Sequence, residues 1–188
     1  RPSSEQTVTS PIVIVGGGFA GLYTALELAR RPGHPPLLLV EPRDRFVFLP
    51  FLYERLSGEL PLWQMAPRYD ALLAGHGIGW QRDRVTAVEP ESCQVVLESG
   101  QRLGYSQLVI ATGAKPDSFG IPGVEEHALR FHSLEDVEAL QAQLPAIRNR
   151  VAIVGAGPSG VELACKLADL LRGQANVELI ERGERCLP

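Results

Sequence analysis

Two glycine-rich segments of the same form are the parts of this chain whose residue types and spacing best suit chemistry. They are GGGFAG at residues 16–21 and GAGPSG at residues 155–160. In each, the first glycine allows a tight turn, the second lets a pyrophosphate approach the backbone, and the third lets a helix pack close to the preceding strand. Backbone N–H groups and the positive end of the helix dipole would then bind a diphosphate without a basic side chain.

An acidic residue follows each glycine segment at the distance that a dinucleotide site requires. Glu41 lies 20 residues after Gly21, and Glu181 lies 21 residues after Gly160. A carboxylate about 20 residues on accepts hydrogen bonds from the adenosine ribose. The alternative is a helix–sheet turn with a chance acid at the next strand end. Because both copies show the same spacing, the sequence favours two dinucleotide sites.

The elements around both glycine segments follow one plan. Apolar, β-branched runs at 12–15 and 151–154 precede the glycines, helical periodicity follows them, and apolar strands come next at 37–41 and 177–181. These patterns predict two strand–helix–strand units, each with parallel strands and a right-handed crossover. The predicted fold class is therefore α/β, with two Rossmann-like dinucleotide-binding units.

The stretch between the two units predicts a helix, a strand, three short alternating runs, a core strand and a further helix. Their ranges are 66–74, 78–81, 84–89, 94–98, 102–105, 108–111 and 133–144. The alternating runs are separated by turn residues, which indicates an antiparallel β-meander. The last helix begins at Ser133 with Asp136 three residues on, the pattern of a capping box. A dinucleotide-binding sheet normally has more strands than follow residue 151, so we expect the natural protein to continue and this fold to be truncated.

The composition narrows the function classes. The chain has 188 residues, a formal net charge of −4, 45% hydrophobic and 21% charged residues, with no basic surplus that would indicate nucleic acid. Its three cysteines form no CxxC pair and its four histidines show no ligand spacing, so neither disulfides nor a metal site is expected. A reducing, cytoplasmic compartment follows from the cysteine usage.

The order of these features resembles a family. Glycine motif, acidic strand end, meander, the Ala111-Thr112-Gly113 segment and second glycine motif are similar to the flavoproteins of the glutathione-reductase fold. The resemblance implies FAD at the first motif and NAD(P)H at the second. It also implies an FAD-binding domain over 11–147 after a polar tail at 1–10, and the start of an NAD(P)H-binding domain over 148–188.

A second resemblance narrows the reaction. Residues 48–58, FLPFLYERLSG, resemble the F-x-P-L-L-x-E-x-x-x-G run of type II NAD(P)H:quinone oxidoreductases. Residues 46–60, with Ala66-Pro67-Arg68, most resemble the cyanobacterial and plastid branch associated with reduction of demethylphylloquinone and related prenylquinones. Many family members carry Lys where this chain has Leu49. The stretch 41–58 holds no cysteine, so a thiol–disulfide relay is not supported. Ferredoxin- or sulfide:quinone-type reductases and a non-catalytic FAD-binding module stay as alternatives.

The resemblance implies the following cofactor-binding residues: Gly16, Gly18, Phe19, Ala20, Gly21, Glu41, Pro50, Val85, Ala111, Thr112, Gly113, Gly155, Gly157, Pro158, Ser159, Gly160, Glu162 and Glu181. Glu162 is expected near the nicotinamide, although a glutamate in the first turn of a helix is also stabilised by the helix dipole. Glu181 favours NADH because a carboxylate repels a 2′-phosphate, and Arg182 beside it leaves NADPH as the alternative. No catalytic side chain is predicted.

The implied partners are NAD(P)H and a prenylquinone-type acceptor. The reaction would transfer hydride from NAD(P)H to the flavin and two electrons on to the quinone, with the chemistry supplied by the cofactor. Peripheral attachment to a thylakoid or plasma membrane is implied through a C-terminal part that follows residue 188. The sequence carries no prediction of the oligomeric state.

Overall fold

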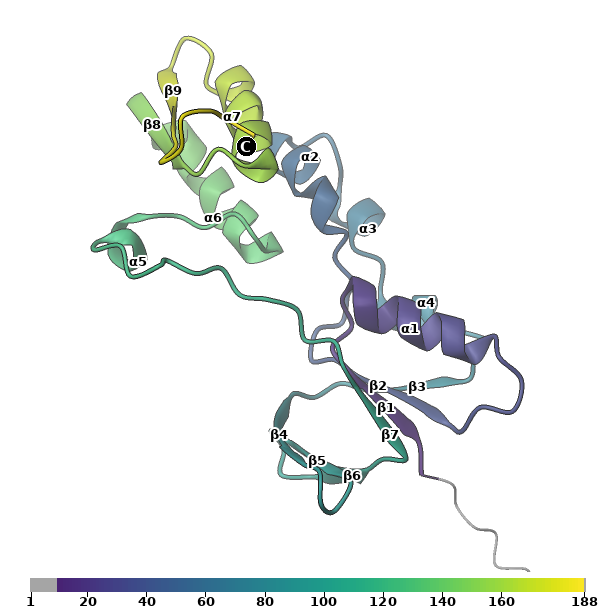
Figure 1. Ribbon diagram of the computed structural model, residues 1–188. Coiled ribbons are helices and arrows are strands. Elements are labelled where there is room, and N and C mark those ends of the chain that lie inside the picture. The colour runs from purple at the N-terminus through teal and green to yellow at the C-terminus, as the bar shows by residue number, and fades with distance from the viewer. Residues whose placement is uncertain (1–9, 188) are drawn as a thin grey trace, which may run out of the picture. The chain divides into compact units, whose positions relative to one another are not determined.

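The structure, a computed structural model, describes residues 10–187. The chain divides into two compact units: Arg1–Val47 with Ala66–Lys115, and Phe48–Met65 with Pro116–Pro188. Figure 1 shows the elements of both units along the chain. In the described part of the chain, no helix has the length and apolarity that a membrane span needs.

The first unit is built on a parallel sheet. Its strands, in spatial order, are β3 (Ile78–Gln81), β2 (Leu37–Val40), β1 (Ile12–Val15) and β7 (Gln107–Ile110). All four residues of β1 are at most 6% exposed, as expected for an apolar run that is covered on both faces. Val15 pairs with Val40 on one side and with Ile110 on the other, so these three strands end together. The loop that leads into helix α1 (Phe19–Ala29) starts at the carboxyl ends of these strands.

The predicted β-meander is confirmed. Strands β4 (Val85–Glu89), β5 (Gln94–Leu97) and β6 (Arg102–Gly104) pair antiparallel in chain order. Val95 and Leu97 of β5 lie in one hydrophobic cluster with Val13, Val15 and Val40 of the parallel sheet. The meander therefore packs on the sheet and belongs to the same core.

The predicted helix over 66–74 is wrong in its extent. Only Tyr69–Leu72 is helical (α4). The Pro67 carbonyl accepts from the Phe46 N–H at 2.9 Å, and Arg45 and Arg68 form an antiparallel bridge. Residues 66–68 are thus not helical, and Arg68 is extended, because their polar groups are used in long-range pairing.

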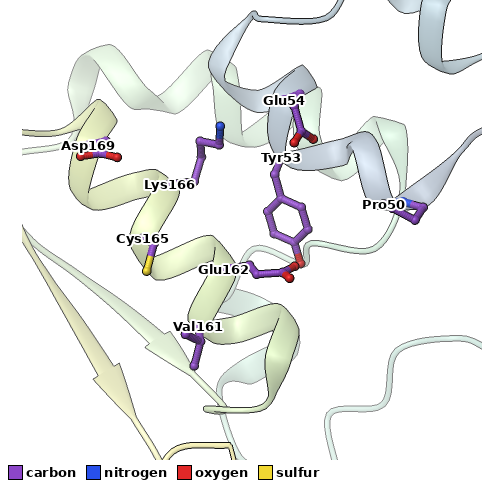
Figure 2. Close-up of a pocket in the computed structure, with 8 residues that line it drawn as sticks. All are labelled: Pro50, Tyr53, Glu54, Val161, Glu162, Cys165, Lys166 and Asp169. Carbon is purple, nitrogen blue, oxygen red and sulfur yellow. The ribbon is translucent and has the colours of Figure 1, made fainter.

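The second unit contains the other strand–helix–strand motif. Strands β8 (Asn149–Val154) and β9 (Ala175–Ile180) are parallel, with helix α7 (Pro158–Leu170) between them in sequence. The remaining elements are η1 (Leu49–Phe51), α2 (Leu52–Ser57), α3 (Leu62–Met65), α5 (Val124–His127), α6 (Leu134–Gln143) and η2 (Leu144–Ala146). Helix α2 packs against α7, and Figure 2 shows the two facing each other.

Side-chain hydrogen bonds join the short elements of the second unit. Gln141 of α6 donates from Nε2 to the carbonyls of Arg55 and Leu56 at 2.7 and 3.2 Å, which ties the end of α2 to α6. The Ser133 hydroxyl accepts from the Asp136 N–H, while the Asp136 carboxylate accepts from the Ser133 N–H. The predicted capping box is therefore confirmed, and it fixes where α6 begins.

Most predicted strands are confirmed, but β7 is less buried than a core strand. Ile110, its last residue, is 64% exposed, and the strand lies at the edge of the four-stranded sheet. The helices α2, α3 and α5 were not separately predicted. They are four to six residues long, too short to show helical periodicity.

Candidate dinucleotide-binding sites

The first glycine loop is held against the residue that follows β7. Gly16 has φ +98°, and a Cβ atom on it would lie 2.8 Å from the carbonyl carbon of Ala111 and closer still to its oxygen. Ala111 in turn donates its N–H to the Val15 carbonyl at 2.8 Å. Only glycine satisfies both the positive φ and this close approach of two backbones.

The rest of the loop leaves room for a ligand. A Cβ atom on Gly21 would lie 2.9 Å from the Gly16 carbonyl carbon, so the helix sits tightly on the loop. A Cβ atom on Gly18 would meet nothing within 4 Å. Helix α1 begins without a side-chain cap and without an acid in its first turn. The backbone N–H groups of its first turn are therefore suited to an anion.

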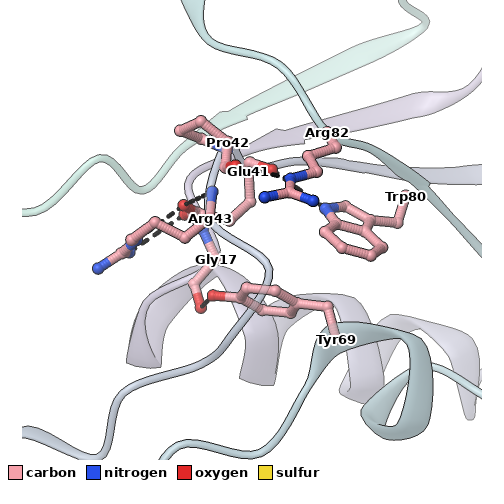
Figure 3. Close-up of polar contacts among 7 residues, drawn as sticks. All are labelled: Gly17, Glu41, Pro42, Arg43, Tyr69, Trp80 and Arg82. Carbon is pink, nitrogen blue, oxygen red and sulfur yellow. Dashed lines mark hydrogen bonds and ion pairs between the residues drawn. The ribbon is translucent and has the colours of Figure 1, made fainter.

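Glu41 lies at the end of β2 and is bonded to the glycine loop (Figure 3). Its carboxylate accepts from the Gly17 N–H at 2.7 Å, and from the N–H, Nε and Nη2 of Arg43 at 3.0, 2.8 and 3.2 Å. Glu41 is only 3% exposed. A carboxylate has about four acceptor positions, so the chain itself uses all of them.

Burial alone would raise the pKa of Glu41. The hydrogen bonds from Arg43 and Gly17, together with the Arg43 charge, outweigh it and hold the pKa below the ordinary value. Glu41 is therefore a charged carboxylate, fixed in place under the loop.

Two aromatic residues, the buried Tyr69 and the half-buried Trp80, complete this site. The Tyr69 hydroxyl donates to the Gly17 carbonyl at 2.6 Å, and its ring, fully buried, lies 5.5 Å from that of Trp80. Trp80 donates from Nε1 to the Glu41 carbonyl at 3.1 Å. Burial and the Glu41 charge raise the pKa of Tyr69, which keeps it a neutral donor. Gly17 is thus held at its N–H by Glu41 and at its carbonyl by Tyr69.

The second glycine loop repeats the relationship with different partners. Ala156 donates its N–H to Glu181 at 2.8 Å, and its carbonyl accepts from the Leu187 N–H at 2.9 Å. Gly183 donates to the other Glu181 oxygen at 2.9 Å, at the position that Arg43 takes in the first unit. These backbone bonds, with the Arg182 backbone and charge, lower the pKa of Glu181.

Glycine is required in the second loop for similar reasons. Gly155 has φ +105°, and a Cβ atom on Gly160 would lie 3.0 Å from the Gly155 carbonyl carbon. A Cβ atom on Gly157 would meet nothing within 4 Å. Pro158 is the first residue of α7, whose N-terminus has no side-chain cap. The open position thus recurs at the same place in the motif.

A cavity of about 430 Å³ lies between α2 and α7 within the second unit (Figure 2). The residues that line it are Pro50, Tyr53, Glu54, Val161, Glu162, Cys165, Lys166 and Asp169. The structure thus brings two predicted residues, Pro50 and Glu162, to one cavity. Ser159 is adjacent, since its carbonyl accepts from the Tyr53 hydroxyl at 3.3 Å.

The remaining predicted residues lie around the first loop or in the core of its unit. Phe19 is partly exposed, with its ring 5.2 Å from that of Phe46, and Ala20 is exposed. Thr112 and Gly113 follow β7 and are exposed, whereas Val85 packs against the hydrophobic cluster of the meander. All three cysteines, Cys93, Cys165 and Cys186, are free and exposed.

Sequence reasoning missed Arg43, Tyr69 and Trp80. Buried tyrosine and tryptophan usually find a hydrogen-bond partner, but the sequence does not say which one. Arg43 lies two residues after Glu41, and that adjacency was the only available signal.

Fold and site together define an α/β protein with two dinucleotide-type loops, each bonded to the acid that ends the next strand. Residues 10–188 match the pyridine nucleotide-disulphide oxidoreductase family, and the chain belongs to that family. The glutathione-reductase-type fold predicted from the sequence is thereby confirmed.

Individual proteins are also similar to this chain over most of its length. The chain is 41% identical to demethylphylloquinone reductase NdbB of Synechocystis sp. and 37% identical to the alternative NAD(P)H-ubiquinone oxidoreductase C1 of Arabidopsis thaliana, with 94% of the chain covered in both cases. It spans 47% and 39% of those proteins. The structure of NDH2 from Plasmodium falciparum in complex with NADH is similar at a TM-score of 0.81 and 26% identity, over 96% of this chain and 43% of that one.

Proposed function

We propose that the complete protein is an FAD-dependent NAD(P)H:quinone oxidoreductase, with FAD at the first glycine loop and NAD(P)H at the second. The observation that carries the proposal is the repeated bond from the second residue of each glycine loop to the acid at the next strand end: Gly17 to Glu41 and Ala156 to Glu181. When bound, FAD supplies the redox chemistry, accepting hydride from NAD(P)H and giving two electrons to the quinone. The boundaries we propose are 11–147 for the FAD domain and 148 onward for the NAD(P)H domain.

The first loop fits a dinucleotide diphosphate. The space at Gly18 admits the phosphates, and the uncapped first turn of α1, with Phe19, Ala20 and Gly21, supplies N–H donors. The segment Ala111-Thr112-Gly113, whose last two residues are exposed, begins against Gly16, beside the loop. We assign it to the flavin side of the site. From the family pattern we propose Val85 as a further FAD contact. Pro50, which lines the cavity of the second unit, is proposed as a cofactor contact from the same pattern.

We propose that Glu41 has two roles: it holds the glycine loop in place, and it binds the ribose. Since its four acceptor positions are used, a ribose hydroxyl must replace one contact from Arg43. The Arg43 side chain is 53% exposed, so its guanidinium can move without disturbing the core, whereas Gly17 cannot. We propose that the ribose shares Glu41 with the Gly17 N–H.

The second loop, Gly155-Ala156-Gly157-Pro158-Ser159-Gly160, is assigned to NAD(P)H. Within residues 10–187, the hydrogen bonds to the Glu181 carboxylate come from backbone N–H groups, so ribose hydroxyls can approach it directly. Its lowered pKa keeps it charged at neutral pH, which disfavours a 2′-phosphate and favours NADH over NADPH. Arg182 makes NADPH the second substrate in order of preference. We assign Glu162 to the nicotinamide end.

A quinone is the acceptor that the relatives support. Demethylphylloquinone reductase and the alternative NAD(P)H-ubiquinone oxidoreductase are named for quinones, and we infer a prenylquinone here. A prenylquinone is held in a membrane, so the complete protein would work at a membrane surface on the cytoplasmic side, thylakoid or plasma membrane. The alternative proposals are a reductase that passes electrons to ferredoxin and a reductase of the sulfide:quinone type.

The absorption spectrum and an acceptor assay test this proposal. The purified complete protein should show a flavin spectrum and release FAD on denaturation. NADH oxidation should be faster with a short-chain prenylquinone than with ferredoxin. A protein that stays colourless after added FAD, or one that prefers ferredoxin or oxidises sulfide, contradicts it.

A further inference from the structure

The cavity between α2 and α7 contains a tyrosine that contacts the second glycine motif. Tyr53 lies on α2, and its hydroxyl donates to the carbonyl of Ser159, the fifth residue of the second glycine motif, at 3.3 Å. Figure 2 shows the same hydroxyl beside the Glu162 carboxylate, with which it interacts. The centroid of the Tyr53 ring lies 5.0 Å from that of Phe131, so the two rings pack against each other.

The α7 side of the cavity is one face of the helix. Its lining residues there, at 161, 162, 165, 166 and 169, recur at helical spacing. Lys166, one turn beyond Glu162, bonds from Nζ to the Glu59 carboxylate at 2.9 Å. Helix α2 and the residues after it are therefore joined to α7 at two levels, through Tyr53 and through Glu59.

These contacts have different consequences for Glu162. The side chains of the Lys166–Glu59 ion pair are 22% and 59% exposed, so water screens the pair and it contributes little to the stability of the contact between Glu59 and α7. Tyr53 is partly buried and acts on the first turn of α7, where Glu162 is exposed to the cavity. A glutamate side chain alone has several rotamers, and a fixed neighbouring hydroxyl selects among them.

We propose that Tyr53 is a positioning residue: its hydroxyl hydrogen, shared between the Ser159 carbonyl and the Glu162 carboxylate, holds the first turn of α7 and orients the Glu162 carboxylate within the cavity. This inference rests on the proposed function, in which Glu162 lies at the nicotinamide end of the second site. Tyr53 thereby links the segment 48–58, with its family-like pattern, to the NAD(P)H motif more than 100 residues later. Its pKa is raised by burial and by the charges of Glu162 and Glu54, so it stays a neutral donor at physiological pH.

A double-mutant cycle in the complete FAD-loaded protein tests the role. Tyr53→Phe keeps the ring against Phe131 and removes only the hydroxyl. It should lower the rate constant of flavin reduction at saturating NADH about tenfold, with the Kd for NADH changed less than about twofold. In the Glu162→Gln background the same substitution should have almost no further effect. Tyr23→Phe, at an exposed tyrosine of α1, is the matched control.

A second readout does not depend on turnover. With ¹³C-labelled tyrosine ring carbons, the titration midpoint of Tyr53 should fall in Glu162→Gln. It should not move in Asp169→Asn, which removes another carboxylate of the same cavity.

The outcomes separate the inference from the function on which it rests. A wild-type protein whose flavin is reduced by neither NADH nor NADPH overturns the proposed function. A normal wild-type rate with no loss in Tyr53→Phe, with equal losses in both backgrounds, or with a Tyr53 midpoint insensitive to Glu162→Gln overturns the positioning role alone.

Discussion

The backbone N–H of Gly17 donates a hydrogen bond of 2.7 Å to the carboxylate of Glu41, 24 residues later in the chain. The bond ties the glycine loop to the end of the neighbouring strand, so the loop keeps one conformation before any ligand arrives. Preorganised donors lose less free energy when a ligand binds. The second unit repeats the relationship through Ala156 and Glu181, and the two copies allow matched experiments.

Substituting the two acids one at a time should separate the two nucleotide sites. Glu41→Gln leaves Gly17 or Arg43 without a charged acceptor, and we expect FAD affinity to fall at least about tenfold and stability by about 1–3 kcal/mol. Glu181→Gln should retain FAD and weaken NADH binding instead. FAD retention on gel filtration and NADH titration measure the two effects. Equal loss of FAD in both variants would contradict the assignment of sites.

The acid limb of the stability curve should depend on Glu41. Its pKa is lowered in the folded protein, so its contribution is fully present above the ordinary value near 4.5 and is lost as the pH falls through the lower, folded value. Urea unfolding of the wild type and of Glu41→Gln at a series of pH values checks this. The difference between them should be constant near neutrality and shrink below about pH 4.5. A difference that does not change with pH would show that Glu41 is not a charged partner.

Alanine at the first glycine of each motif should have unequal effects. Both Gly16 and Gly155 have positive φ, so each substitution carries a backbone cost of about 1–2 kcal/mol. At Gly16 the new Cβ atom would also collide with the Ala111 backbone, whereas at Gly155 nothing lies within 4 Å. We expect Gly16→Ala to cost about 1–3 kcal/mol more. Denaturant unfolding of both variants tests the ranking, and a larger loss in Gly155→Ala would refute the contact.

Removing the Tyr69 hydroxyl should loosen the first loop. Tyr69→Phe leaves the buried Gly17 carbonyl without its 2.6 Å donor, at an expected cost of about 1–3 kcal/mol and with weaker FAD binding. Tyr23→Phe removes a hydroxyl from a side chain that is 61% exposed and serves as the control. Thermal unfolding and FAD titration of the two variants test whether the Tyr69 hydroxyl supports the loop. Identical behaviour would mean that Tyr69 does not support the loop.

Local sequence patterns were sufficient for much of the fold. The run Ile12–Val15 is buried along its whole length, so it could be recognised as a central parallel strand. The capping box at Ser133 and Asp136 depends on residues three positions apart and was equally readable. The local pattern failed where distant pairing competes with it: residues 66–68 are not helical, because Phe46 pairs with Pro67 and Arg45 with Arg68.

Of the two sites, only the glycine motifs and the acids that follow them were predictable from the sequence. Glycine spacing and the distance to the acid follow from one strand–helix–strand unit, so both could be counted along the chain. The Tyr69 bond spans 52 residues and the Tyr53 bond spans 106, and neither leaves a local signature. The saturation of Glu41 by Arg43 depends on the side-chain geometry after β2, which the sequence does not specify.

Anaerobic mixing of the complete, FAD-loaded protein with NADH in a stopped-flow spectrophotometer tests whether the nucleotide reduces the flavin. We expect rapid bleaching of the flavin absorbance by NADH, slower bleaching by NADPH, and recovery of the absorbance when a prenylquinone is added. A flavin that neither nucleotide bleaches would contradict the assignment of the second loop to NAD(P)H and, with it, the proposed oxidoreductase.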